Sequence, residues 1–171
     1  MNFLDKFLFF QPVINGVGGN LVAVQASRLS TYLHSSSPMG VLPKSEPKIC
    51  IDPFTVMFGS NAHARTSRIL LAMAPLGHLI FTFTITFLEA GHTSPTPIFL
   101  VIYLTAAVIQ VWILLHTAQW MIFWFWTKKI DPDNSAIPYL TALGDLLGGA
   151  LLWAAFEILF MLGDKDADVG D

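Results

Sequence analysis

Charged side chains are scarce in this 171-residue chain, because Asp, Glu, Lys and Arg make up only 12% of it. Soluble domains carry about a quarter charged residues, so this composition argues against a water-soluble domain. The single cysteine, Cys50, excludes an internal disulfide and a metal site built from several thiolates. The formal net charge of −3 provides no basic surface for nucleic acid.

Apolar residues, by contrast, are abundant. They make up 54% of the chain and include 14 Phe and 5 Trp. A chain of this length has too small a core to bury them all. We therefore expect its surface to face a lipid bilayer or a large partner.

The few charges separate long apolar stretches, each comparable with the roughly 20 residues that cross a bilayer core. The N-terminal stretch lacks a basic start and a small-residue cleavage site, so we expect a retained helix and not a secretory signal. We predict an all-α membrane protein in which residues 1–171 form a single membrane domain. Its four spans are expected at about residues 7–33, 69–89, 97–126 and 136–162.

The connections between the spans predict the orientation. Residues 35–68 contain four prolines and most of the loop charge, which indicates a solvated loop with a short membrane-surface helix near Phe54–Phe58. Lys and Arg concentrate in this loop and at Lys128 and Lys129, whereas residues 90–96 contain none. The positive-inside rule then puts both basic loops in the cytosol and the acidic tail, residues 163–171, on the other side. An interfacial aromatic belt is expected at the cytosolic end of the third span, formed by Trp120, Trp124 and Trp126.

Asp145 lies inside the last predicted span, where a carboxylate costs about 2.5–3.5 kcal/mol on insertion scales. Helical periodicity predicts that small and oxygen-bearing residues share one stripe with it. This stripe consists of Asn134, Pro138, Thr141, Asp145, Gly148 and Leu152. Asp145 either contacts a cation or, in the alternative interpretation, is protonated or hydrogen-bonded and joins two helices.

The first span has a comparable stripe, which consists of Gly16, Asn20, Ala23, Ser27 and Thr31. The alternative for this segment is a kinked, closely packed helix without an ion. Hard cations such as Mg²⁺ prefer oxygen ligands and keep part of their water shell. We therefore predict an oxygen-lined cation path with four candidate ligands and, at its cytosolic mouth, additional oxygens from Asp131 and Asp133. The candidate ligands are Asp145, Asn20, Thr141 and Asn134.

The sequence contains no motif that indicates an enzymatic activity. Nucleophile-elbow, zinc-protease and phosphate-binding motifs are all missing. Gly144 and Asp145 lack a second membrane aspartate, so an intramembrane aspartyl protease is excluded. We expect no cofactor. The intramembrane histidines His78 and His116 are expected to be hydrogen-bonded packing residues.

Two long segments carry a family resemblance. PVINGVGGNLVAVQASRLSTYLH (Pro12–His34) and DPDNSAIPYLTALGDLLGGALL (Asp131–Leu152) resemble the signatures of the MgtE-type magnesium transporters, in particular their animal branch, solute carrier family 41. The resemblance implies a five-helix transport unit whose second and fifth helices line the ion path. These correspond here to the first and fourth spans, and Asp145 matches the pore aspartate.

The resemblance also implies Mg²⁺ as the transported ion, exchanged for Na⁺, and a unit that is used twice. The chain resembles most of one unit without its first helix and without a cytosolic magnesium-sensing domain. It would therefore pair with itself or with a full-length family member. The resulting hypothesis is Mg²⁺ transport, at the plasma membrane in preference to the mitochondrial inner membrane. The alternative is a truncated, non-transporting subunit that regulates a full-length relative.

Overall fold

The computed structural model describes residues 3–46, 48–88 and 96–163. This part of the chain is helical, without strands. Its helices are α1 (Phe3–Ser36), α2 (Pro53–Phe58), α3 (Ala62–Leu88), α4 (Pro97–Thr127) and α5 (Pro132–Met161). All except α2 are long and apolar enough to cross a membrane. The predicted all-α membrane architecture is confirmed.

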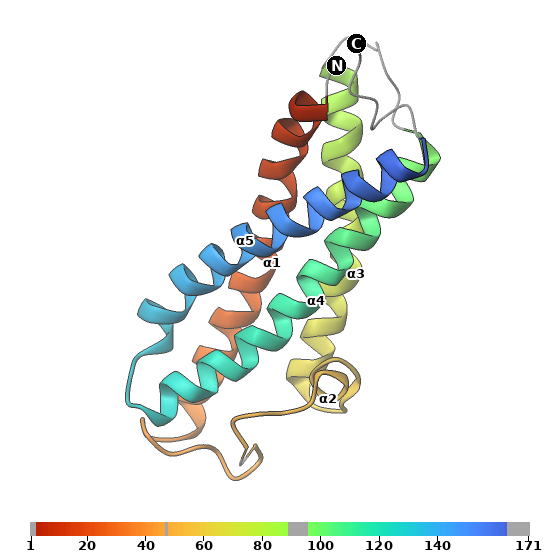
Figure 1. The fold of residues 1–171 in the computed structure, drawn as a ribbon. Helices are drawn as coiled ribbons and strands as arrows, with labels where there is room; N and C mark the ends of the chain where they lie inside the picture. The colour runs from red at the N-terminus through yellow and green to blue at the C-terminus, as the bar shows by residue number, and fades with distance from the viewer. Residues whose placement is uncertain (1–2, 47, 89–95, 164–171) are drawn as a thin grey trace.

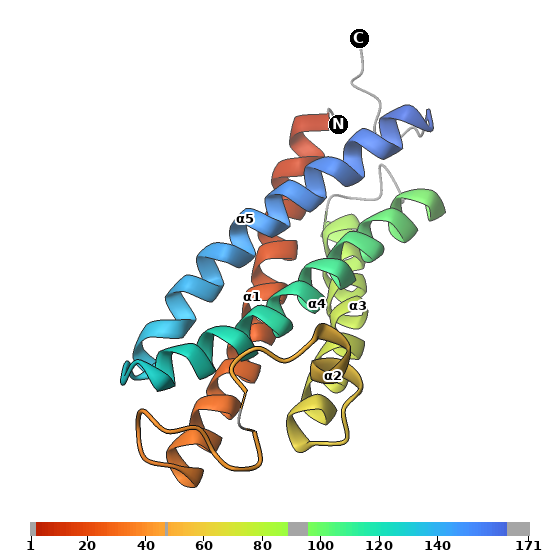
Figure 2. The same cartoon turned by 60° about the horizontal axis from the view of Figure 1, so that its bottom comes forward.

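The four long helices run up and down in one bundle (Figures 1 and 2). α1 packs most extensively on α5, α4 packs on α5 and α1, and α3 packs on α1 and α4. One end of the bundle carries the connection between α1 and α3, including α2, together with the turn between α4 and α5 (Figure 1). We call it the loop end. It is the end that carries the basic loops of the sequence.

Proline and capping residues determine where the helices begin. Thr96 and Asp131 cap α4 and α5 by accepting hydrogen bonds from the backbone N–H groups of Phe99 and Asp133. A proline follows each cap, at a position where the missing N–H costs nothing. α4 ends at the loop end, where Lys129 adopts a left-handed backbone conformation with φ of 58°. The chain can therefore reverse within a few residues and enter α5.

Several helix boundaries differ from the predicted spans, and α5, for example, begins at Pro132 and not at residue 136. α1 continues to Ser36, past residue 33, and α3 begins at Ala62 and not at residue 69. Arg65 and Arg68 lie in the first turns of α3 and are exposed. Charge ends an apolar run but does not end a helix, so α3 extends beyond its apolar segment. A short helix, α2, does form at the position predicted near Phe54–Phe58.

The predicted aromatic belt is wrong at one position. Trp120 and Trp124 are exposed and stack with ring centroids 6.2 Å apart. Trp126 is only 1% exposed and packs in the core shared by α1, α4 and α5. Its indole N–H donates a hydrogen bond to the Val41 carbonyl over 3.0 Å. Contact with the loop therefore buries Trp126, which was predicted to lie at the interface. Its hydrogen bond holds the residues near Val41 against the bundle.

Candidate functional site

The four predicted cation ligands all lie on the outside of the bundle. Asp145, Thr141 and Asn134 are exposed on α5, and Asn20 is exposed on α1. Asp145 has no hydrogen-bond or ion-pair partner within the described residues. It therefore does not join two helices of this chain, as the alternative interpretation expected. An unpartnered carboxylate on a membrane helix requires a polar group or a cation from elsewhere.

The predicted stripe on α5 divides in the structure, so the expectation of one continuous face is wrong. Asn134, Pro138, Thr141 and Asp145 are exposed, whereas Gly148 and Leu152 are buried. The stripe drifts around the helix, and from Gly148 onward α1 and α4 cover it. The hydroxyl of Thr141 donates to the Ile137 carbonyl over 2.9 Å. Only the half of the stripe nearer the loop end can face a partner.

Asn20 lies on the side of α1 that faces α3. It lines a surface groove of about 210 Å³ with Gly16 and Val17 of the same helix and Phe81 of α3. No hydrogen bond joins Asn20 to Asp145 in the described part of the chain. Thr141 and Asp145 are thus both exposed one turn apart on α5, whereas Asn20 lines the groove between α1 and α3.

A second polar group, which we call the amide node, is buried between α1, α4 and α5. It consists of Asn15, Gly18, Gln110, Gly144 and Gly148. Gln110 is completely buried, and its Nε2 donates a hydrogen bond over 2.9 Å to the carbonyl of Gly144, the residue before Asp145. The side-chain oxygens of Asn15 and Gln110 are also buried.

The glycines of the amide node make room for these amides. A Cβ on Gly148 would overlap Asn15 Oδ1 and lie 2.7 Å from Gln110 Nε2. A Cβ on Gly18 would lie 2.9 Å from Gln110 Oε1. Close helix contact through small residues, with a polar side chain bonded across the interface, is typical of membrane bundles. Sequence reasoning missed the role of Gln110, although an isolated amide in the apolar third span was a signal.

A third polar group lies at the loop end, where His34 of α1 meets Asp131 and Asp133 of α5. His34 Nε2 is 3.4 Å from Asp131 Oδ1 and 3.7 Å from Asp133 Oδ2, and these ligand atoms lie within 4.8 Å of one another. Asn134 donates to Asp131 Oδ2 over 3.0 Å. Two carboxylates and an imidazole could hold a divalent cation. Sequence reasoning proposed Asp131 and Asp133 at this mouth but missed His34, which is 97 residues from Asp131 along the chain.

The two intramembrane histidines differ in their hydrogen bonding. His78 is completely buried, and its Nδ1 is 2.9 Å from the Tyr103 hydroxyl, which confirms it as a hydrogen-bonded packing residue. Among the described residues, neither the buried Nδ1 of His116 nor the buried Nε2 of His78 has a hydrogen-bond partner, so the expectation is met at Nδ1 of His78 and not at Nδ1 of His116.

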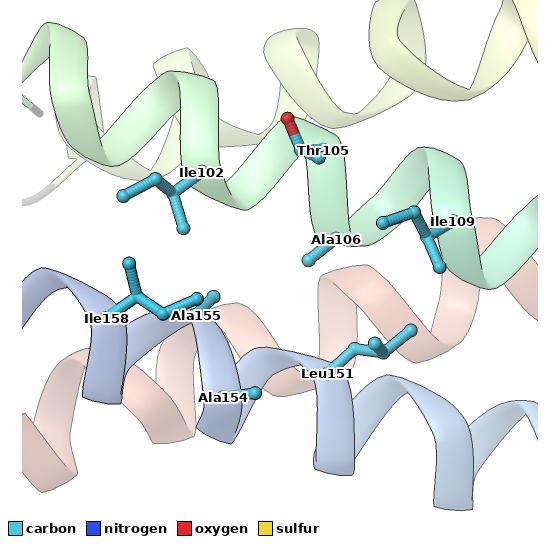
Figure 3. A pocket seen from close by; sticks show the side chains of 8 residues that line it. All are labelled: Ile102, Thr105, Ala106, Ile109, Leu151, Ala154, Ala155 and Ile158. Atoms are coloured by element: carbon cyan, nitrogen blue, oxygen red, sulfur yellow. The ribbon is translucent and has the colours of Figure 1, made fainter.

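An apolar groove between α4 and α5 offers no cation site. Its volume is about 230 Å³, and Figure 3 shows side chains of both helices facing each other across it. Thr105 is the single hydroxyl in the lining, and it donates to the Val101 carbonyl of its own helix over 2.7 Å. A groove of this composition suits a lipid chain and excludes a hydrated ion.

Comparison with known proteins shows which family this chain resembles. The family model MgtE, described as a divalent cation transporter, matches residues 11–155. The chain is 56% identical over 168 residues to solute carrier family 41 member 2 of Mus musculus, covering 98% of this chain and 29% of that protein. The Homo sapiens protein of the same name gives the same identity and coverage. Solute carrier family 41 member 3 of Rattus norvegicus is 44% identical over 151 residues, which cover 88% of this chain and 33% of that protein.

The chain therefore spans about a third of the length of these curated relatives. No solved structure matches it.

Proposed function

Since the chain belongs to the MgtE family of divalent cation transporters, we propose that it forms half of a transmembrane path for Mg²⁺, with Asp145 as the main cation contact. The observation that carries this proposal is the exposed, unpartnered Asp145 carboxylate on a membrane helix. The chain itself does not neutralise this charge. A partly hydrated divalent cation would supply the missing positive charge, and Thr141 would add an oxygen one turn nearer the loop end.

The path needs a second polar surface opposite Asp145, because a carboxylate that faces hydrocarbon is energetically costly. A second copy of this chain, or a full-length relative, would cover the exposed polar faces of α1 and α5. Asn20, Ser27 and Thr31 are exposed on α1 and would meet the partner's surface across the path. Pairing thus explains both polar faces at once.

The cluster of His34, Asp131 and Asp133 would be the cytosolic mouth of this path. Asn134 lies beside it and is separated from Asp145 by 11 residues, which is about 16 Å along an α-helix. A cation entering or leaving would therefore meet carboxylates at the mouth and again at Asp145. The exchange of Mg²⁺ for Na⁺ and the plasma membrane as location belong to the same proposal.

The test is Mg²⁺ flux into liposomes that contain the purified chain and an entrapped indicator dye. We expect flux from the unaltered chain and background flux from Asp145→Asn, because the amide cannot balance a divalent charge. Glu157→Gln is the matched control, since Glu157 is also a carboxylate on α5 but lies 12 residues further along the helix. Unchanged flux in Asp145→Asn would refute the role of Asp145. An imposed Na⁺ gradient that leaves the flux unchanged would refute exchange.

A second candidate function is favoured by the exposed polar faces of α1 and α5, which this chain does not itself cover. It is that of a non-transporting subunit, which assembles with a full-length relative and regulates it. Absence of flux from the purified chain, together with co-purification and altered flux of the full-length relative, would support this function over the first.

A further inference from the structure

The helix α2 has one buried side and one exposed aromatic side. Val56 and Met57 are buried, whereas Phe54 and Phe58 are 70% and 68% exposed. The two phenylalanines are one helical turn apart, and their rings stack with centroids 6.4 Å apart. Helices that lie in the membrane–water interface bury an apolar face of Trp, Phe or Leu at the boundary between headgroups and acyl chains.

The orientation of α2 is held by contacts with the membrane bundle. Met57 packs in a core cluster with Leu70 of α3 and Val111 of α4. The Arg68 guanidinium donates hydrogen bonds of 3.1 Å to the carbonyls of both Met57 and Gly59. Because these contacts occupy one side of the helix, Phe54 and Phe58 remain on the outside.

The outside of α3 next to α2 is apolar and exposed. α2 lies beside the start of α3 at the loop end (Figures 1 and 2). Directly after Arg68, the exposed residues of α3 include Ile69, Met73 and Leu76, which are 54%, 50% and 60% exposed. Since α3 is long and apolar enough to span the membrane, we expect these exposed side chains to face lipid. Phe54 and Phe58 would extend this apolar surface toward the loop end.

The charges around α2 complement a phospholipid surface. Arg65 and Arg68 are exposed in the first turns of α3, and Lys48 is exposed in the preceding loop. Asp52 caps α2 by accepting from both the N–H and the hydroxyl of Thr55, and its carboxylate adds one negative charge to these three positive ones. The surface beside the phenylalanines is therefore basic, which suits anionic headgroups.

We propose that α2 is an interfacial anchor. Phe54 and Phe58 insert into the leaflet at the loop end, at the boundary between headgroups and acyl chains, and Arg65 and Arg68 contact the headgroups. The anchor holds the connection between α1 and α3 on the membrane surface. It does not depend on whether the chain transports a cation.

The test measures the depth of nitroxide labels in liposomes that contain anionic lipid. Labels are attached to Phe54→Cys or Phe58→Cys in a Cys50→Ser background, so that each variant keeps the other phenylalanine. Ile69→Cys is the lipid-facing reference and Lys44→Cys the loop reference. We expect labels at both α2 positions to be accessible to oxygen and protected from a water-soluble nickel chelate, as at Ile69. Accessibility to nickel as at Lys44, or protection from both reagents by a protein partner, would overturn the proposal.

A second measurement keeps Cys50 and tests the anchor by its removal. In liposomes whose loop end faces the protease, Phe54→Ser/Phe58→Ser should increase trypsin cleavage at Lys44 and Lys48 about tenfold, because the connection opens more often when its apolar contacts are lost. Phe83→Ser/Phe87→Ser is the matched control, with two exposed phenylalanines spaced identically on α3. Equal cleavage of the two double variants would contradict the proposal.

Discussion

The amide node and the Asp145 face of α5 contain polar side chains of similar kind in opposite settings. In the amide node, Gln110 is buried and bonds across to the Gly144 carbonyl. One residue further along α5, Asp145 is exposed and has no partner within the described residues. Polar residues inside membrane helices thus serve two purposes here. One set joins the helices of this chain, and the other is exposed on α5, where the proposed path would bring a cation or a second subunit to it.

The difference depends on small residues. Gly18 and Gly148 let α1, α4 and α5 approach closely enough for an amide to reach the Gly144 carbonyl. This contact holds the α5 backbone immediately before Asp145. The buried node therefore supports the exposed carboxylate by holding the turn of α5 that carries it.

The largest effect is expected from adding one methyl group to the amide node. Gly148→Ala would place Cβ against Asn15 Oδ1 and Gln110 Nε2, at a cost of about 1–3 kcal/mol from overpacking. Gly16→Ala is the matched control, because a Cβ there meets nothing within 4 Å. The midpoint temperature of unfolding in detergent should fall for Gly148→Ala and stay or rise for Gly16→Ala. Equal midpoints would show that the node is not closely packed.

A smaller effect is expected when the hydrogen bond alone is removed. Gln110→Leu should lower the stability of the bundle by about 0.6 kcal/mol, the average for interhelical hydrogen bonds in membranes, and by no more than about 1.7 kcal/mol. Asp145→Leu should leave the unfolding midpoint unchanged or raise it, since the carboxylate has no partner to lose. Thermal unfolding of both variants in the same detergent checks this. If Asp145→Leu lowered the unfolding midpoint more than Gln110→Leu, then Asp145, and not Gln110, would be the residue that joins the helices.

The cluster of His34, Asp131 and Asp133 is intermediate between these two settings. Its side chains lie close to one another within the chain, but they remain partly exposed. Asp133→Asn should weaken binding of Mn²⁺, used as a spectroscopic substitute for Mg²⁺, because it removes one of two carboxylates near His34. Asp131 is less suitable for this test, since it also caps α5. Electron paramagnetic resonance of free Mn²⁺ gives the affinity. Equal Mn²⁺ binding in Asp133→Asn and the unaltered chain would remove the cluster from the path.

The smallest effect concerns Glu46, a buried carboxylate in the connection between α1 and α3. Asn61 Nδ2 donates to Glu46 Oε1 over 3.1 Å, and His63 Nε2 lies 3.7 Å from the same oxygen. Burial raises the pKa of Glu46 above its ordinary value, although the bond from Asn61 opposes this. The folded state therefore favours the protonated form.

The stability contributed by Glu46 is present below its unfolded pKa and is lost as the pH rises through its higher folded pKa. Between pH 4 and 7, proteolysis of the connection in the unaltered chain should thus accelerate relative to Glu46→Gln, which stays neutral and keeps the acceptor for Asn61. The ratio of the two cleavage rates at each pH cancels changes in the protease itself. A ratio that does not change with pH would contradict the assignment.

Much of the fold could be predicted from local sequence properties. Apolar run length predicted the four long apolar helices, and a short helix near Phe54–Phe58 was expected within the connection that forms α2. The boundaries were less accurate, because Arg65 and Arg68 lie within α3 and not before it. In the candidate site, Asp145 was identified by its cost in a membrane, which depends only on its own span.

Contacts between distant segments could not be predicted in this way. Gln110 and Gly144 are 34 residues apart, and His34 and Asp131 are 97 apart. Helical periodicity places Gly148 and Asp145 on related faces, yet only the packing of neighbouring helices buries the first and exposes the second.

By itself, then, the sequence determined that this is a membrane bundle with scarce charges at its ends and one conspicuous carboxylate in its last helix. Hydrophobicity and helical propensity are local, so one chain segment suffices to reveal them. Only the tertiary structure decided which polar residues are satisfied within the chain and which are left facing outward. Hydrogen bonding within a bundle depends on the distances between helices, and these emerge only when the helices pack.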